Sequence, residues 1–194
     1  MARPLAFDPN EKLHQAMMLF WRRGYEATSL QDLVDELGIN RFSLYNTFGD
    51  KQTLFARVVD VYEQRVFGPL LKTLEPPGEG LTRLETYLDT LAKGLRQQPA
   101  VNGCFLQNTV LAGEVRDTQV LNHIRDVFQR LQAALAEVVD GAKAQGEIDE
   151  SESTQELADY LLMQVQGLIA LHGLGAPERA ENALRQLKQQ IRKW

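Results

Sequence analysis

The stretch that decides the fold is GYEATSLQDLVDELGINRFSLYNTFGDKQTLF, residues Gly24–Phe55. Within it, Leu30–Leu37 and Arg41–Phe48 carry apolar residues at helical spacing, and both segments are shorter than the average helix of about 11–12 residues. Gly38 lies between them and can adopt the left-handed backbone conformation that a tight reversal requires. Two short helices joined by such a turn are typical of a helix-turn-helix motif.

Residues that commonly begin helices stand at the expected places around this motif. Ser29, with Asp32 three positions later, predicts a capping box before the first short helix. Asn40 is the predicted N-cap of the second helix. Asp50 is the predicted N-cap of a longer helix that runs towards Leu74. The N-terminal part of the chain is therefore predicted to be a set of closely spaced helices.

The remainder of the sequence is also helical in pattern, and the alternation that is typical of strands is absent. Asp8 and Pro9 predict the start of a helix that ends at Gly24, and residues 75–78 (EPPG) predict a break. Further helices are predicted at Leu81–Leu95, at Phe105–Leu111, from Val120 to near Gly146, at Glu156–Gly173 and at Pro177–Lys193. We expect an all-α fold of about nine helices, with a three-helix domain containing the helix-turn-helix over residues 1–55 and a second helical domain over residues 56–194.

Composition indicates a chain that packs a core in water. Hydrophobic residues make up 44% of the sequence and charged residues 24%. No apolar run approaches the length of a membrane span, and no signal peptide is evident behind the first residues. The single cysteine, Cys104, excludes an internal disulfide and a multi-cysteine zinc site. We expect a cytoplasmic protein with no membrane association.

Charge and histidine content narrow the function classes. The net charge of −5, from 21 basic and 26 acidic residues, gives nucleic-acid binding no global support, so such binding must rest on local geometry. His14, His123 and His172 fall in separate predicted helices, and no nucleophile elbow, metal-ligand spacing or phosphate loop is present. We therefore predict no catalytic residue, metal or cofactor, with an enzyme kept as an alternative.

The second short helix has two chemically different faces. Leu44 and Phe48, four residues apart, share the face that is predicted to point inward. Arg41, at the N-terminal end, could reach a guanine edge if the helix lay in a major groove of DNA. The side opposite Leu44 and Phe48 and its flanks carry aromatic, amide and hydroxyl groups, namely Phe42, Ser43, Tyr45 and Asn46.

The same stretch resembles the DNA-binding domain of the tetracycline-repressor (TetR) family. The matching pieces are Gly24-Tyr25, Thr28-Ser29-Leu30, Leu37-Gly38-Ile39, Leu44-Tyr45, Phe48, and Lys51 followed by Leu54-Phe55. The resemblance implies a sequence-specific DNA-binding transcriptional regulator, a dimeric repressor that a small-molecule effector releases from a palindromic operator. Residues 56–194 would then bind the effector and form the dimer. A helical ligand-binding or scaffold protein with a vestigial helix-turn-helix remains an alternative.

The resemblance also implies roles for single residues in DNA binding. Tyr45 has the alternative of packing between helices, Lys51 that of a solvated surface cation, and Phe42 that of covering apolar surface rather than contacting a thymine methyl. Helix N-termini attract phosphate, which independently favours Thr28 and Lys51 as phosphate contacts. The implied base-reading residues are Arg41, Phe42, Ser43 and Asn46. The implied phosphate contacts are Thr28, Tyr45, Thr47 and Lys51.

Dimer and effector contacts follow from the same resemblance. The last two predicted helices would pair with those of a second copy through apolar residues, although these could instead pack within one chain. The implied interface residues are Leu161, Val165, Leu168, Leu184, Leu187 and Ile191. The implied effector-pocket residues, each with plain core as its alternative, are Leu88, Leu91, Cys104, Phe105, Asn108, His123 and Phe128.

Cys104 raises a separate hypothesis. The pair Gly103-Cys104 resembles a TetR subgroup that includes electrophile- and oxidant-responsive repressors. A thiol at a helix N-terminus would be more acidic and more reactive. The alternative is a small buried apolar group, which is how most free cysteines behave.

Overall fold

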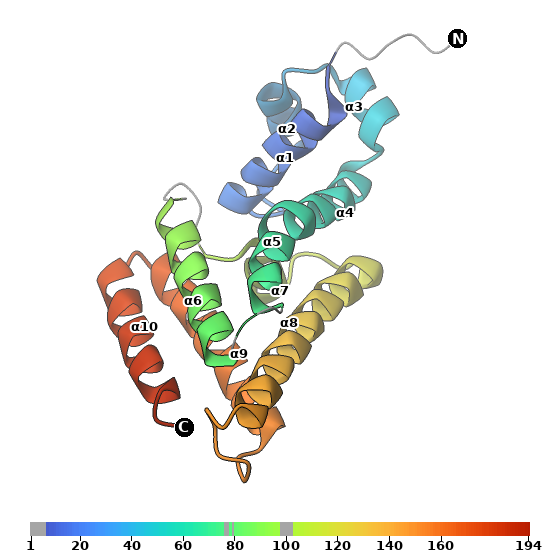
Figure 1. Cartoon of the computed structure of the whole chain (residues 1–194). Helices are drawn as coiled ribbons and strands as arrows, with labels where there is room; N and C mark the ends of the chain where they lie inside the picture. The colour runs from blue at the N-terminus through green and yellow to red at the C-terminus, as the bar shows by residue number, and fades with distance from the viewer. Residues whose placement is uncertain (1–6, 76–77, 79, 98–102) are drawn as a thin grey trace. The chain divides into compact units, whose positions relative to one another are not determined.

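Figure 1 shows the computed structural model, which describes residues 7–75, 78, 80–97 and 103–194. These residues form helices joined by loops, and no strand occurs among them. In chain order the helices are α1 (Pro9–Arg23), α2 (Leu30–Leu37), α3 (Arg41–Phe48), α4 (Lys51–Tyr62), the π-helix η1 (Glu63–Phe67), α5 (Gly68–Leu71), the 3-10 turn η2 (Lys72–Leu74), α6 (Gly80–Gln97), α7 (Phe105–Ala112), α8 (Thr118–Ala144), α9 (Thr154–Gly173) and α10 (Pro177–Ile191). With the unbroken run from α4 to η2 counted as one helix, the described residues hold nine, and the all-α prediction is confirmed.

The chain divides into two compact units. Unit 1 contains the described residues up to Arg65 together with Phe105–Ile124, and unit 2 contains Val66–Cys104 and Arg125–Trp194. This division differs from the predicted boundary after residue 55, because α4 continues as one helix through that position and α7 packs with the N-terminal helices. None of the described helices is both long enough and apolar enough to cross a membrane.

The predicted helix caps of unit 1 are confirmed. The Ser29 hydroxyl accepts the Asp32 N–H while the Asp32 carboxylate accepts the Ser29 N–H, which completes the capping box of α2. The Asn40 side chain accepts the Ser43 N–H at 2.8 Å at the start of α3. Gly38 has a φ of 61°, a left-handed conformation that side chains disfavour, so the turn between α2 and α3 depends on glycine.

Aromatic rings form the centre of unit 1. Phe20 of α1 meets Phe55 of α4 edge to face, with ring centroids 5.0 Å apart. Trp21 of α1 meets Tyr62 of α4 in the same way at 5.1 Å. Phe105 of α7 lies 5.5 Å from Phe55, which places α7 in this core. The N-terminal helices are thus packed with a helix that lies far along the sequence.

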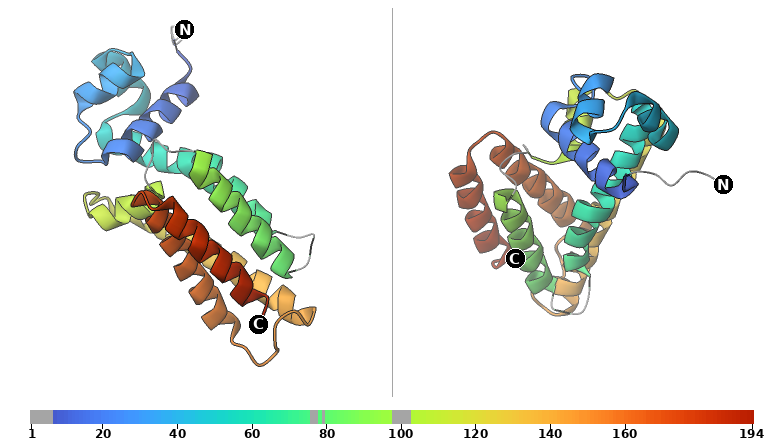
Figure 2. Two further views of the ribbon diagram at one scale, coloured as in Figure 1. Left: turned by 90° about the vertical axis from the view of Figure 1, so that its left-hand side faces the viewer. Right: turned by 90° about the horizontal axis from the view of Figure 1, so that it is seen from above.

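Unit 2 is built around three neighbouring helices. Figures 1 and 2 show α6, α9 and α10 side by side, and each contacts the other two. Their polar contacts lie at the surface, as where Arg192 Nε donates to Glu85 Oε1 at 2.6 Å. Exposed ion pairs contribute little to stability, so the apolar faces between the helices hold this unit together.

Those apolar faces contain most of the side chains that the sequence assigned to a dimer interface. Five of them are buried within the single chain, with exposures of 0–6%, because they fill the space between neighbouring helices of unit 2. Because they are buried within one chain, they leave little apolar surface for a second copy, and their place at a dimer interface stays a prediction. The five are Leu161, Val165, Leu168, Leu187 and Ile191, and the sixth, Leu184, is half-buried.

Candidate nucleic-acid interface

The orientation predicted for α3 is confirmed. Leu44 is fully buried and Phe48 is 1% exposed, so this face of the helix anchors it in the core of unit 1. Arg41 and Asn46 are exposed on the outward side, and Ser43 is half-buried. Phe42 is 75% exposed and therefore covers little apolar surface of its own chain.

Tyr45 lies on the outward side of the same helix. Its ring is 40% exposed, which makes it a surface residue rather than a core contact between helices. The guanidinium carbon of Arg41 lies 5.8 Å from the centre of the ring. A cation over an aromatic face at this distance is weakly attracted, so the pair limits the freedom of Arg41 at the start of α3.

Lys51 is held at the start of α4. Its ammonium nitrogen lies 4.4 Å from the ring centre of Tyr25. Partial burial raises the pKa of Tyr25, and the neighbouring carboxylates of Glu26, Asp50 and Asp117 raise it further. The ring that Lys51 contacts thus lies in the field of several acidic groups.

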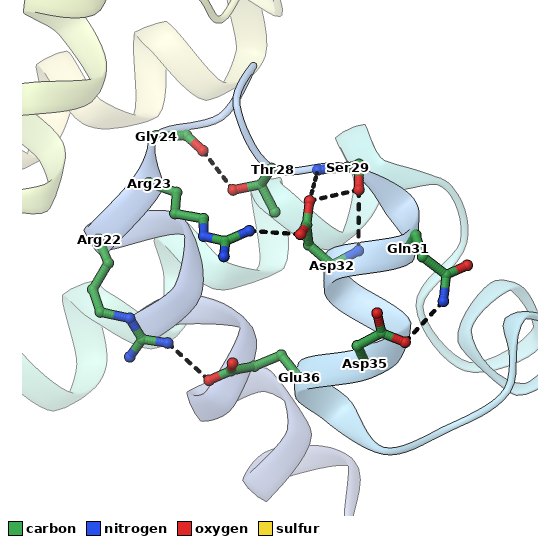
Figure 3. Close-up of polar contacts among 9 residues, drawn as sticks. All are labelled: Arg22, Arg23, Gly24, Thr28, Ser29, Gln31, Asp32, Asp35 and Glu36. Atoms are coloured by element: carbon green, nitrogen blue, oxygen red, sulfur yellow. Dashed lines mark hydrogen bonds and ion pairs between the residues drawn. The ribbon is translucent and has the colours of Figure 1, made fainter.

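Two of the threonines predicted to contact phosphate are not available for it. Thr28 is 0% exposed, and its hydroxyl donates to the Gly24 carbonyl at 2.7 Å, as Figure 3 shows. The Thr47 hydroxyl oxygen is also buried. In this structure neither hydroxyl is turned towards solvent, and a phosphate contact by Thr28 or Thr47 stays a prediction. Sequence alone does not show which way a threonine beside a turn points.

Figure 3 also shows how α1 neutralises the acidic side of α2. Arg23 donates to Asp32 at 2.6 Å, and Arg22 donates to Glu36 at 2.8 Å. Hydrogen bonds from Ser29, and then from Arg23, lower the pKa of Asp32 to about 2. Its contribution to stability is therefore present above the ordinary pKa of aspartate and is lost only as the pH falls through about 2. At neutral pH these pairings reduce the negative charge that α2 would present to DNA.

The loop between α7 and α8 is bonded to the helix-turn-helix region. Glu114 Oε2 accepts the Glu26 N–H at 3.0 Å, and Gln52 Nε2 donates to Asp117 Oδ2 at 2.8 Å. Between these groups lies a polar pocket of about 660 Å³, open to solvent, with Tyr25 in its wall. No local sequence pattern marks these contacts, because the partners lie more than sixty residues apart.

The seven candidate effector residues do not fall in one unit. Phe105 is buried in the aromatic core of unit 1, and Asn108 is exposed on α7. His123 is half-exposed, and its Nε2 lies 2.7 Å from Glu63 Oε2 within unit 1. The remaining four, Leu88, Leu91, Cys104 and Phe128, belong to unit 2, and Cys104 is 7% exposed.

Unit 2 contains an apolar pocket between α6, α9 and α10. It is partly open to solvent, and the space between its lining residues, open solvent included, is about 360 Å³. Its only charged pair is Arg96 with Glu181, 3.7 Å apart, and His172 also lies in the wall. The apolar lining consists of Leu88, Leu91, Ala92, Leu95, Leu168, Pro177, Ala180 and Leu184. Of the seven predicted effector residues, Leu88 and Leu91 line this pocket and the other five do not. Leu168 and Leu184 had been placed at the dimer interface.

Comparison with known proteins identifies two family models and several relatives of this chain. Residues 13–58 match the model of the bacterial regulatory proteins of the tetR family, and residues 80–187 match the tetracyclin repressor-like C-terminal domain. An uncharacterized HTH-type transcriptional regulator, YezE of Bacillus subtilis, is 32% identical over 162 residues, which cover 83% of this chain and 84% of YezE. The HTH-type transcriptional repressor ComR of Escherichia coli is 30% identical over 167 residues, which cover 86% of this chain and 80% of ComR.

A solved structure supports the same relationship. A cysteine mutant of the TetR family transcriptional regulator CifR, complexed with 26-bp operator DNA, is 25% identical and has a TM-score of 0.83. The match covers 99% of this chain and all of that one. Two family models that together span most of the sequence, and relatives that align along most of their length, place this chain in the tetR family of bacterial regulatory proteins.

Proposed function

We propose that this chain is a transcriptional repressor that binds a palindromic DNA operator as a homodimer and is released by a small-molecule effector. The observation that carries the proposal is the outward face of α3, where Arg41, Phe42 and Asn46 are exposed opposite the buried Leu44 and Phe48. The operator complex of the related CifR supports DNA as the partner. We assign no catalytic role and expect the protein to act in the cytoplasm, where its DNA target lies.

The exposed groups have the chemistry to read bases. Arg41 can donate two hydrogen bonds to a guanine edge, and Asn46 can pair with an adenine edge. Phe42 can contact a thymine methyl, and the half-buried Ser43 can reach either strand's base edges. Lys51 is half-buried and Tyr45 is exposed, and these two are the proposed phosphate contacts, as the family resemblance implies.

A palindromic operator requires two copies of α3, and the outward face of α9 is the proposed contact between copies. Met163 is 60% exposed and Leu174 is 80% exposed. Gly167 and Ala170 lie between them on the same stripe and are also exposed. Two small residues between two large apolar ones would allow the α9 helices of two chains to approach closely.

Gly167→Arg is expected to convert the dimer to a monomer without unfolding it. No atom lies within 4 Å of the position that a Cβ at Gly167 would occupy, so the chain itself has room for the new side chain. Sedimentation velocity measures the mass, and a thermal melt checks folding. Gln129→Arg on the exposed side of α8 is the control. A Gly167→Arg variant that stays dimeric would show that another face makes the contact.

Operator binding tests the whole proposal. Wild-type protein should recover a preferred, palindromic duplex from a pool of random sequences. Arg41→Ala should weaken binding to that duplex by about 1–3 kcal/mol and relax the preference at one base position in each half-site. Lys51→Ala should weaken binding to all sequences and lower the salt slope by about one per protomer.

The controls separate base contact from charge. Arg179→Ala, on the exposed side of α10, removes the same charge as Arg41→Ala and is expected to leave the base preference unchanged. If Arg41→Ala kept the wild-type preference at every position, α3 would not be the reading helix.

A screen of small, mainly apolar compounds for release of the recovered duplex tests the effector part of the proposal. Compounds that fit the apolar pocket of unit 2 are expected to release the duplex from the protein. If none of them releases the duplex, this pocket would not be the effector site.

A further inference from the structure

The C-terminal end of α3 is bonded to a side chain that no sequence motif marks. A helix leaves its last four carbonyls without partners inside the helix. At this end the Gly49 N–H donates to the Tyr45 carbonyl at 3.0 Å. The Thr47 carbonyl accepts a hydrogen bond from Arg57 Nη1 of α4 at 2.7 Å. A positive side chain at a helix C-terminus is also favoured by the helix dipole.

The same guanidinium makes a second contact with α3. Its central carbon lies 5.1 Å from the ring centre of Phe48, which is buried on the inward face of α3. Because the bonded carbonyl and the ring belong to consecutive residues, one planar group holds both the backbone and a core side chain of α3. Arg57 itself is half-buried, so these contacts are made in a partly desolvated place.

This connection matters because of how α3 is otherwise held. Leu44 and Phe48 are the two buried anchors of α3 and lie in one row along the helix, with the half-buried Ser43 and Thr47 beside them. Two buried anchors in one row resist tilting of the helix better than rotation about the row. A rotation of about 10° about this row would move an atom that lies about 6 Å from the row by about 1 Å, and atoms farther away by more. The side chains of a binding site are effective only when they are held within about 0.5 Å of the geometry that binding requires. The residues displaced most would be those on the outward face, including Phe42 and Asn46.

We propose that Arg57 is a positioning residue for DNA reading, which fixes the rotation of α3 on α4 through the Thr47 carbonyl and the Phe48 ring. The inference rests on the proposed function, since it concerns the accuracy with which α3 meets base edges. A planar guanidinium can donate to the carbonyl and stack on the ring at once. A direct phosphate contact by Arg57 is the competing role, and it differs in its dependence on salt.

Arg57→Met tests the inference, because methionine keeps the apolar stem and removes both the donor and the charge. The readouts are the ratio of affinities for the recovered operator duplex and a shuffled duplex of equal composition, and the salt slope of binding. We expect the ratio to fall about tenfold, as for one lost base contact, with the slope unchanged. A slope lowered by about one with an unchanged ratio would make Arg57 a phosphate contact and overturn the inference. No change in either readout would overturn it as well.

Two further variants complete the design. Arg65→Met removes the same charge from an exposed position and should change neither readout, so an equal fall in the ratio would attribute the effect to net charge and overturn the inference. If Arg57→Met does not fold, Arg57→Lys takes its place. Its single nitrogen cannot make both contacts, so we expect an intermediate ratio at the wild-type slope, and a wild-type ratio would overturn the inference.

The outcomes also separate this inference from the proposed function. A wild-type protein that selects no preferred duplex would contradict both, because α3 would then have no bases to read. A wild-type protein with a clear preference, combined with an Arg57→Met variant of equal preference, would contradict the positioning role alone.

Discussion

Replacing Phe48 by alanine is expected to lower the free energy of unfolding by about 3–5 kcal/mol and to abolish specific DNA binding. The ring is 1% exposed, so its removal leaves a cavity in unit 1 that the surrounding helices can fill only in part. It also removes the surface on which Arg57 stacks. Urea unfolding followed by circular dichroism measures the loss of stability, and operator titration measures the loss of binding.

Phe42→Ala is the matched control, because it makes the same chemical change six positions earlier on the same helix. Phe42 is 75% exposed, so the expected change in stability is within about 0.5 kcal/mol. Its effect should appear only in DNA binding, as a weaker preference at one base pair. Equal losses of stability in the two variants would contradict the assignment of an inward and an outward face to α3.

Gly80→Ala is expected to destabilise unit 2 by about 1–3 kcal/mol. A Cβ at this position would lie 2.5 Å from the Ala142 nitrogen and 2.7 Å from the Ala142 Cα. These are backbone atoms of α8, so the start of α6 must move away. That movement would also strain the bonds from the Gly80 N–H to Gln145 at 3.1 Å and from the Leu81 N–H to Glu147 at 3.1 Å. Urea unfolding measures the change.

Gly94→Ala tests the cause, since it makes the same substitution in the same helix. Nothing lies within 4 Å of a Cβ at Gly94, and α6 is helical there. Alanine should therefore stabilise the protein by about 0.5–1 kcal/mol through its higher helix propensity. If Gly80→Ala also stabilised the protein, α6 and α8 would not approach as closely as the structure has them.

Much of the N-terminal region could be predicted from short-range sequence signals. The bounds of α3, the caps Ser29, Asn40 and Asp50, and the left-handed Gly38 all depend on contacts within a few residues. The inward direction of Leu44 and Phe48 follows from helical spacing in the same way. These features are local, so the order of residues along the chain is enough to specify them.

The predicted site residues that are buried in the structure have surroundings that come from distant parts of the chain. Leu161 and Val165 were assigned to a dimer because an apolar stripe looks the same whether it meets the same chain or another one. Phe105 was assigned to an effector pocket, but it packs against rings of α1 and α4. Thr28 was predicted to contact phosphate from the family resemblance and from its place at a helix N-terminus, and in the structure its hydroxyl donates to the Gly24 carbonyl.

By itself, therefore, the sequence determined that the described part of the chain is helical, where α3 begins and ends, and which side of α3 faces outward. Hydrogen bonding and periodicity within a helix are local, which is why the sequence suffices for these features. Only the tertiary structure decided that α7 packs with the N-terminal unit, that the apolar stripes of α9 and α10 are internal, and that Arg57 holds the end of α3. These three features depend on contacts between segments that are far apart in the sequence. No local sequence pattern predicts which of those segments pack together in the folded chain.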